Sequence, residues 1–240
     1  MKRIIFLLAG FLPLVSVLAQ KTIINDPNVE VRVVKGYHGI EVSSAIDLYL
    51  SQGDGETVAV SAAEIKWRDR IRTEVENGIL KIWVDTKGFT WSSGNKKMKA
   101  YVSFTTLDKL VASGASNVYV DGVISGNSLD IVLSGASDFK GAIKVNELRL
   151  NQSGASDAHI TGTVEGLTSI RSSGASDVKG YELVTGSCNA NLSGASDVRI
   201  TVNKELNVSA SGASSLYYKG DGVIRDLHSS GASSVVSKKS

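Results

Sequence analysis

Serine, glycine and aspartate are the residues of this chain whose spacing could support catalysis. In Ser134-Gly135-Ala136-Ser137-Asp138, a glycine stands two residues before a serine, as in the nucleophile elbow of many hydrolases. That turn also requires a glycine two residues after the serine, where this chain has Phe139. His38, His159 and His228 have no constant spacing to such a serine, and none has a second ligand at metal-binding spacing. The pattern therefore argues against a serine hydrolase.

The five residues are repeated along the chain, whereas catalysis needs a single nucleophile. The copies begin at Ser113, Ser134, Ser153, Ser173, Ser193, Ser211 and Ser230. Their period of about twenty residues is typical of a repeat architecture. The repetition therefore favours a structural role, in which the same corner of the fold is formed in every unit.

The residue after the second serine is the other candidate for chemistry. It is acidic or an amide in these copies: Asp47, Asn117, Asp138, Asp157, Asp177 and Asp197. In stacked units, consecutive carboxylates would lie about 4.8 Å apart and repel one another. Calcium, which binds oxygen ligands, could occupy such a column; alternatively, each carboxylate accepts hydrogen bonds in its own turn and faces water. We expect the second arrangement, with no metal, cofactor or catalytic residue.

Basic residues accompany three of these aspartates. Lys140, Lys179 and Arg199 follow them by two residues. Calcium-dependent β-helical polysaccharide lyases combine such carboxylates with a basic residue that acts as the base, but ordinary strand alternation gives the same spacing. A lyase requires carboxylates and a lysine or arginine to converge in one groove, whereas a binding protein does not.

Apolar residues alternate with polar ones on both sides of the copies, which predicts β-strands. The residues three positions before the first serine are all apolar: Leu110, Ile131, Leu150, Ile170, Ala190, Val208 and Leu227. The residues five positions after it are also apolar: Val118, Phe139, Ala158, Val178, Val198, Leu216 and Val235. We expect both positions to point into a core.

A unit of twenty residues cannot bury its own apolar face, but stacked units can share one core. The sequence therefore predicts an all-β fold over residues 106–240, a parallel, right-handed β-solenoid (β-helix) with coils of about twenty residues. An antiparallel barrel or sandwich is the competing fold. Neither of those folds requires the same five residues in every unit.

Residues 20–105 are predicted to form a less regular all-β part made of degenerate coils. Residues 40–50 align with residues 110–120, with Ala45 in register, and form an eighth copy that lacks the glycine. Further strands are expected at residues 57–60, 71–76 and 79–84, the last two joined by a hairpin at Asn77-Gly78.

Each corner combines residues suited to a tight bend. The glycine supplies a positive φ or a close backbone approach. The alanine, present in all eight copies, is expected to fill a space with room for a methyl group only. The serines and the aspartate can accept hydrogen bonds from backbone N–H groups. Which serine faces inward stays open, because a bulge at the glycine would reverse the alternation.

Five further side chains bear on function. Cys188 takes a position held by leucine in other copies, so we expect a buried and inert thiol. Trp67, Trp83 and Trp91 cluster in the N-terminal part, with Phe89 beside the last. They could form an exposed platform for a sugar ring, but we expect a covered core.

The first 19 residues have the features of a cleaved secretory signal peptide. Lys2 and Arg3 precede an apolar run at residues 4–18, and a small-x-small site predicts cleavage between Ala19 and Gln20. No later segment approaches the roughly 20 apolar residues needed to span a membrane. The mature protein is therefore expected in the periplasm, on the cell surface or outside the cell.

The charge balance argues against a nucleic-acid-binding protein, and the cysteine content excludes a fold stabilised by internal disulfides. Removal of Lys2 and Arg3 reduces the 26 basic residues to 24, equal to the 24 acidic residues. This balance gives no electrostatic basis for binding nucleic acid. Cys188 is the only cysteine, so the chain cannot form an internal disulfide and must be stabilised by packing.

An exported β-chain that repeats Ser-Gly-Ala-Ser-Asp after a hairpin at Asn77-Gly78 resembles the bacterial auto-transporter adhesin, head GIN domain family. The resemblance covers nearly all of the mature chain, and the repeated segment is its most specific part. It implies a secreted or surface β-helical domain with no established catalytic residues.

The functional expectation is a non-enzymatic adhesin or binding scaffold. The alternative is a carbohydrate-active β-helix, either a pectinase-like polysaccharide lyase or a glycan-binding protein. Candidate partners are a surface glycan, a component of the host or of the cell envelope, and a second copy of the chain.

Overall fold

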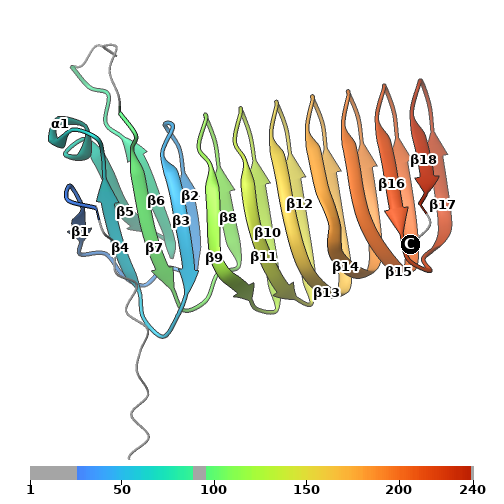
Figure 1. The fold of residues 1–240 in the computed structure, drawn as a ribbon, viewed down its shortest axis with the longest axis horizontal. Helices are drawn as coiled ribbons and strands as arrows, with labels where there is room; N and C mark the ends of the chain where they lie inside the picture. Colours follow the sequence, from blue (N-terminus) through green and yellow to red (C-terminus); the bar gives the residue numbers. More distant parts are fainter. Residues whose placement is uncertain (1–25, 89–95, 239–240) are drawn as a thin grey trace, which may run out of the picture.

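The strands of the chain stack along one long axis into a β-solenoid, as predicted (Figure 1). The computed structural model describes residues 26–88 and 96–238. The predicted signal peptide at residues 1–19, Phe89 and Trp91 lie outside the described residues. No helix in the described part of the chain is long and apolar enough to cross a membrane.

Each regular coil contributes one strand before its corner and one strand after it. The strands before the corners form a parallel sheet, the pre-corner sheet. Its strands are β6 (Ile79–Val84), β2 (Gly39–Val42), β8 (Lys109–Ala112), β10 (Ser128–Leu133), β12 (Glu147–Gln152), the second halves of β13 (Asp157–Ser172), β14 (Asp177–Leu192) and β15 (Asp197–Ala210), and β17 (Val223–Ser229).

The strands after the corners form a second parallel sheet, the post-corner sheet, and the apolar core lies between the two sheets. Its strands are β7 (Lys99–Phe104), β3 (Asp47–Gln52), β9 (Val118–Ser125), β11 (Phe139–Val145), the first halves of β13, β14 and β15, β16 (Ser215–Lys219) and β18 (Ser234–Ser237).

Equivalent positions of successive coils pair in register, so each apolar position forms a column through the core. Leu150 pairs with Ile131 on one side and Ile170 on the other, and all three are 0% exposed. The polar neighbours Arg149 and Arg171 are exposed, because adjacent residues of a strand face opposite sides. The predicted inward positions are therefore confirmed in the internal coils.

The eighth copy stacks directly on the first regular copy, although 70 residues separate them in sequence. β2 pairs with β8, and β3 pairs with β9. The Ser113 N–H donates to the Val42 carbonyl at 3.0 Å. The chain between the two copies therefore passes to the other side of β2 and β3, where β6 and β7 pair with them, before it returns as β8 and β9.

The predicted degenerate coils of residues 20–105 are only partly present. β2 and β3 form a coil, and β6 and β7 add one parallel level beside them. β4 (Thr57–Ser61) instead runs antiparallel to both β7 and β1 (Glu30–Arg32). β5 (Ile71–Glu76) runs antiparallel to β6, and a short helix, α1 (Ile65–Arg68), lies between β4 and β5.

Turn chemistry explains this difference. Asn77 and Gly78 have positive φ values of 52° and 76°, as a two-residue hairpin turn requires, so the predicted hairpin is confirmed. At this turn the chain reverses within the pre-corner sheet, so β5 and β6 form an antiparallel pair.

β1, β4, β5 and α1 form an N-terminal cap at one end of the solenoid (Figure 1). Arg68 pairs with Glu30 at 3.0 Å, and Arg32 pairs with the same carboxylate at 2.9 Å, which joins α1 to β1. Trp67 of α1 is 1% exposed, so the expectation of a covered core holds for this tryptophan.

The backbone of each corner is bonded to the corner of the preceding coil. The N–H groups of Ala136 and Ala155 donate to the carbonyls of Gly114 and Gly135, each at 2.8 Å. Gly154 has a φ of +81°, and a Cβ at this position would lie 2.4 Å from the Gly135 oxygen. Glycine is therefore required by both its backbone conformation and its contact with the preceding coil.

The second serine of the corner faces inward, which resolves the alternative left open by the sequence. Ser156 is 0% exposed, and its hydroxyl donates to the Ser153 carbonyl at 3.0 Å. Ser176 donates to Ser173 in the same way at 2.9 Å. The buried hydroxyl thus satisfies a carbonyl inside the bend.

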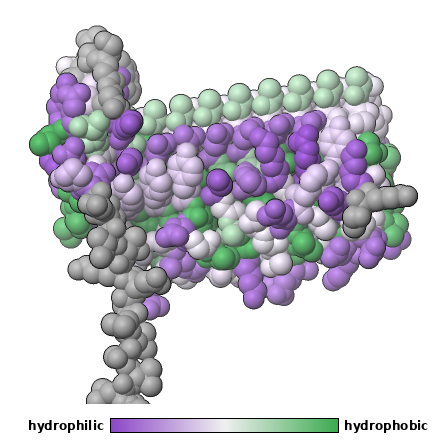
Figure 2. Space-filling view, viewed as in Figure 1, coloured by the Kyte–Doolittle hydropathy of each residue, from purple (hydrophilic) through white to green (hydrophobic). Residues whose placement is uncertain are grey.

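The expectation that the corner alanine fills a restricted space is wrong. Ala136, Ala155 and Ala175 are exposed, like the alanines of the other copies. Figure 2 shows a regular row of weakly hydrophobic residues along the corner edge. The close contact in the corner involves the glycine, and the alanine methyl group points to solvent.

Substitution at the glycine should therefore be far more damaging than substitution at the alanine. Gly154→Ala is expected to lower the free energy of unfolding by at least about 2 kcal/mol, because it combines a left-handed φ with a backbone clash. Ala155→Val should change it by less than about 0.5 kcal/mol. Urea denaturation measures both values, and equal losses would contradict the contact assigned to glycine.

The alternation along a strand can be tested at two neighbouring residues. Ile170→Ala is expected to cost roughly 2 to 5 kcal/mol, because it leaves a cavity between Leu150 and Ala190. Arg171→Ala should have little effect, since this side chain is exposed. Thermal denaturation measures the stability of both variants. Equal losses would contradict the assignment of Ile170 to the core and Arg171 to the surface.

Candidate functional site

The corner serines are structural. The second serine of each internal corner is buried, so its hydroxyl is not presented to a substrate. In Ser156, Ser176, Ser196 and Ser214 the hydroxyl donates to a carbonyl of its own bend. His38 pairs with Asp108 at 2.9 Å, and His228 pairs with Asp226 at 3.3 Å. These two histidines are therefore engaged with carboxylates, and neither orients a corner serine.

The aspartates after the corners form the predicted column on the outer face of the post-corner sheet. Asp157 pairs in register with Asp177, which pairs with Asp197, and the Asp157 N–H donates to the Asp138 carboxylate at 3.2 Å. The bond to Asp138 therefore comes from the next coil and not from its own turn. In the described residues, no group of three or more His, Cys, Asp or Glu side chains is placed to hold a metal ion.

Cationic side chains accompany the aspartate column on the same face. Lys179 lies 3.1 Å from the Asp157 carboxylate, and Arg199 lies 3.2 Å from Asp197. The hydrogen bond that Lys179 donates to the Asp157 carboxylate raises the pKa of the Lys179 ammonium. These ion pairs supply the charge compensation that a calcium ion would otherwise provide.

Three tyrosines continue the cationic column toward the N-terminal cap. Tyr49 stacks between Tyr101 and Tyr119, with ring centroids 5.2 Å apart on both sides. The sequence alignment of the first two copies places Tyr49 over Tyr119, but it gives no sign of Tyr101. Both faces of the Tyr49 ring are therefore occupied by neighbouring rings.

Cys188 and the tryptophans have different environments. Cys188 is 0% exposed, so the expected burial is confirmed, and that burial raises the pKa of its thiol to about 12. Trp83 is only partly buried, unlike Trp67. Its indole lines a cavity on the outer face of the pre-corner sheet.

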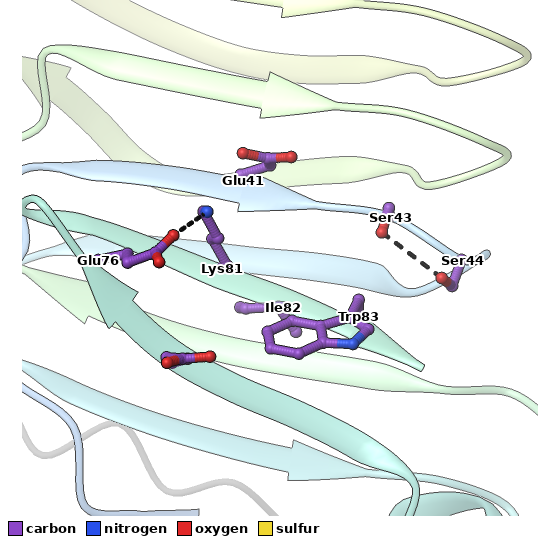
Figure 3. Close-up of a pocket in the computed structure, with 8 residues that line it drawn as sticks. Glu41, Ser43, Ser44, Glu76, Lys81, Ile82 and Trp83 are labelled. Atoms are coloured by element: carbon purple, nitrogen blue, oxygen red, sulfur yellow. Dashed lines mark hydrogen bonds and ion pairs between the residues drawn. The ribbon is translucent and has the colours of Figure 1, made fainter. Parts of the chain in front are cut away.

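This cavity has a volume of about 380 Å³ and lies between β2, β5 and β6 (Figure 3). We call it the Trp83 pocket. The hairpin β5–β6 forms one wall, and the degenerate corner after β2 forms another. Its lining residues are Glu41, Ser43, Ser44, Glu74, Glu76, Lys81, Ile82 and Trp83.

Strand pairing brings the charged groups of the Trp83 pocket together. Lys81 pairs across the hairpin with Glu74 and across the parallel pair with Glu41, and its ammonium forms an ion pair with Glu76 (Figure 3). The hydrogen bond between them lowers the pKa of the Glu76 carboxyl and raises the pKa of the Lys81 ammonium. Three carboxylates around one ammonium leave the pocket acidic.

The corner beside the pocket departs from the repeat. Ser44 and Ala45 have positive φ values of 69° and 59°, whereas in the regular corners the glycine alone among the corner residues has a positive φ. The Ser43 and Ser44 hydroxyls lie 3.4 Å apart at the edge of the pocket. The corner hydroxyls therefore line the same pocket as the indole and the charged groups of the hairpin.

Sequence reasoning singled out Trp83 but missed the carboxylates and the lysine. The two-residue turn at Asn77-Gly78 fixes the register of the hairpin, so Glu74 could have been placed opposite Lys81 from the sequence. Glu41 could not have been placed beside Lys81 from the sequence, because its position depends on the long-range pairing of β2 with β6.

The comparisons with known proteins identify a family and a fold. The sequence matches the family described as "Putative auto-transporter adhesin, head GIN domain" over residues 36–222. A search of curated proteins finds no match.

Solved structures share the fold at low sequence identity. A putative adhesin from Bacteroides fragilis aligns with a TM-score of 0.80 at 20% identity, covering 88% of this chain and 96% of the other. Two proteins from Parabacteroides distasonis are also similar. The putative adhesin gives a TM-score of 0.65 at 20% identity (86% and 95% coverage), and the putative lipid binding protein gives 0.63 at 22% identity (88% and 98%).

These identities show a shared fold, and the family match carries the assignment. The matched residues 36–222 include the degenerate first coil, most of the N-terminal cap and nearly all of the regular coils. The resemblance inferred from the repeated corners is thereby confirmed. The chain belongs to the family described as "Putative auto-transporter adhesin, head GIN domain".

Proposed function

We propose that this protein is an exported, non-enzymatic binding protein of the bacterial cell envelope that binds a glycan in the Trp83 pocket. Export is supported by the signal-peptide features of residues 1–19. A binding role agrees with membership of an adhesin family. The single observation that carries the proposal is a partly exposed indole beside three carboxylates, one ammonium and two hydroxyls.

A sugar ring matches both kinds of surface in this pocket. Its C–H face can pack against the indole of Trp83, while its hydroxyls donate to carboxylates such as Glu41 and Glu74 in charge-assisted hydrogen bonds. The cavity volume of about 380 Å³ falls in the range of small-molecule sites. The excess of carboxylates favours a neutral or amino sugar over an acidic one.

The polysaccharide lyase is the second candidate, because carboxylates and a lysine do converge in the Trp83 pocket. A lyase base must accept a proton, so its pKa should lie near the working pH. The hydrogen bond with Glu76 shifts the pKa of Lys81 in the opposite direction, above its ordinary value. The pocket therefore favours binding over proton abstraction.

Replacement of Trp83 should weaken glycan binding. We expect Trp83→Ala to raise the dissociation constant by about tenfold or more, and Trp83→Phe to retain part of the affinity, because stacking is lost only in the first variant. A glycan array of neutral, amino and acidic sugars selects the ligand, and calorimetry measures the affinity. Tyr119→Ala removes an exposed aromatic ring from the opposite sheet and serves as the matched control.

Two outcomes of that experiment oppose the proposal. Either the array shows no bound glycan, or Trp83→Ala and Tyr119→Ala leave the affinity of the selected glycan equally unchanged. A loss in both variants would point to a binding surface that is not confined to the pocket.

Calcium should leave thermal stability nearly unchanged, because Lys179 and Arg199 already pair with the aspartate column. We expect a shift in melting temperature below about 1 °C. A calcium site would instead add roughly 2.7 kcal/mol at about 100 times its dissociation constant, and Asp157→Asn would abolish that gain. Such a shift, together with unsaturated products from an acidic polysaccharide, would favour the lyase.

A further inference from the structure

The last described coil exposes side chains that the internal coils bury. Leu227 of β17 is 46% exposed, whereas Val208, Ala190 and Ile170, in the same column, are 3%, 2% and 0% exposed. The C-terminal end of the core is therefore open at this column.

Two further inward columns end in the same way. Ile224 and Val235 are only partly buried, whereas their neighbours in the preceding coil, Leu206 and Leu216, are 0% exposed. Val223, at the start of β17, is 56% exposed. Leu227, Ile224 and Val235 therefore have the positions of core residues but lack a coil on one side.

The backbone of this coil is also open. Among the described residues, β17 pairs only with β15, and β18 pairs only with β16. Each strand therefore presents one row of N–H and C=O groups that pairs with no strand, which is a template for strand addition. β18 has the sequence Ser-Val-Val-Ser, without the charge or proline that blunts many edge strands.

The occupant that fits this end is a coil with the same two strands and the same apolar columns. The opposite end of the solenoid is not available for head-to-tail stacking, because α1 and β1 cover it and are joined by the ion pairs of Glu30. Two C-terminal ends can instead meet each other. Such an interface uses the same surface on both copies and closes into a two-fold dimer.

The sequence of β17 is complementary to itself in an antiparallel pair. The pairing of β17 with β15 shifts register at Arg225. As a result, Arg225 and Asp226 both lie on the outer face. Ile224 and Leu227, on either side of them, face the core. If two copies of β17 pair antiparallel about the midpoint between Arg225 and Asp226, Arg225 of each copy lies opposite Asp226 of the other. The same register places Ile224 opposite Leu227, so charges and apolar side chains match simultaneously.

We propose that the protein forms a two-fold symmetric dimer in which β17 and β18 add to the same strands of a second copy. The two cores then become one continuous core, and the exposed apolar residues of β17 and β18 are covered. This proposal does not depend on the Trp83 pocket, which lies in the coils next to the N-terminal cap.

Sedimentation equilibrium of the full chain between about 1 and 100 µM tests the proposal. We expect a dimer, and we expect Leu227→Asp to raise its dissociation constant by at least about tenfold, because a carboxylate would be buried without a partner. Leu227 is exposed in the single chain, so this variant should keep its fold. Val33→Asp, at a 97% exposed residue near the N-terminal cap, is the matched control and should leave the dimer unchanged.

A charge exchange tests the antiparallel register. Arg225→Asp and Asp226→Arg should each weaken the dimer, because like charges then face each other across the two-fold axis. The double variant should restore the association, since opposite charges face each other again. A wild-type chain that stays monomeric at all concentrations overturns the proposal, as does a dimer that Leu227→Asp leaves intact or a double variant that fails to recover.

Discussion

The hydrogen bond from each corner alanine N–H to the glycine carbonyl of the preceding coil is the contact on which the solenoid depends. It measures 2.8 Å in successive regular corners, as between Ala155 and Gly135 or Ala175 and Gly154. A constant corner contact keeps a constant register, and that register stacks each apolar side chain on its counterpart. The same carbonyl stands 2.4 Å from where a Cβ of Gly154 would lie. The repeated glycine thus sets the spacing of the coils, while the alanine beside it contributes its N–H.

The regular part of the fold could be predicted because its signals are local. Alternation gave the strands, the twenty-residue period gave the stacking, and Asn77-Gly78 gave the hairpin. The direction of side chains within the corner could not be predicted, because the positive φ of the glycine breaks the alternation there. The path of residues 53–105 could not be predicted either. The chain returns so that β8 pairs with β2, and this tertiary contact has no local signal in the sequence.

The candidate site also combines features with a local sequence signal and features that depend on tertiary contacts. Trp83 and its hairpin neighbours share one strand face, so their proximity is a local property of the register. Glu41 joins them only because β2 lies parallel to β6. The pocket forms where the repeat is imperfect, at the corner in which Ser44 replaces glycine and keeps a positive φ of 69°. A regular corner would carry the chain past this point with its small side chains flush against the next coil.

A solenoid buries its core only where coils have neighbours, so its two ends are its weakest points. At the N-terminal end, antiparallel strands and α1 cover the core, and the irregular strand order of this region follows from that requirement. At the C-terminal end, the columns that run through Ile170 and Val208 continue to an exposed Leu227. If the two open ends pair, the Trp83 pockets lie at opposite ends of one rod, where each can engage its own ligand. A bivalent rod of this kind would hold two ligand-bearing surfaces more tightly than one pocket can, since the second binding event becomes intramolecular.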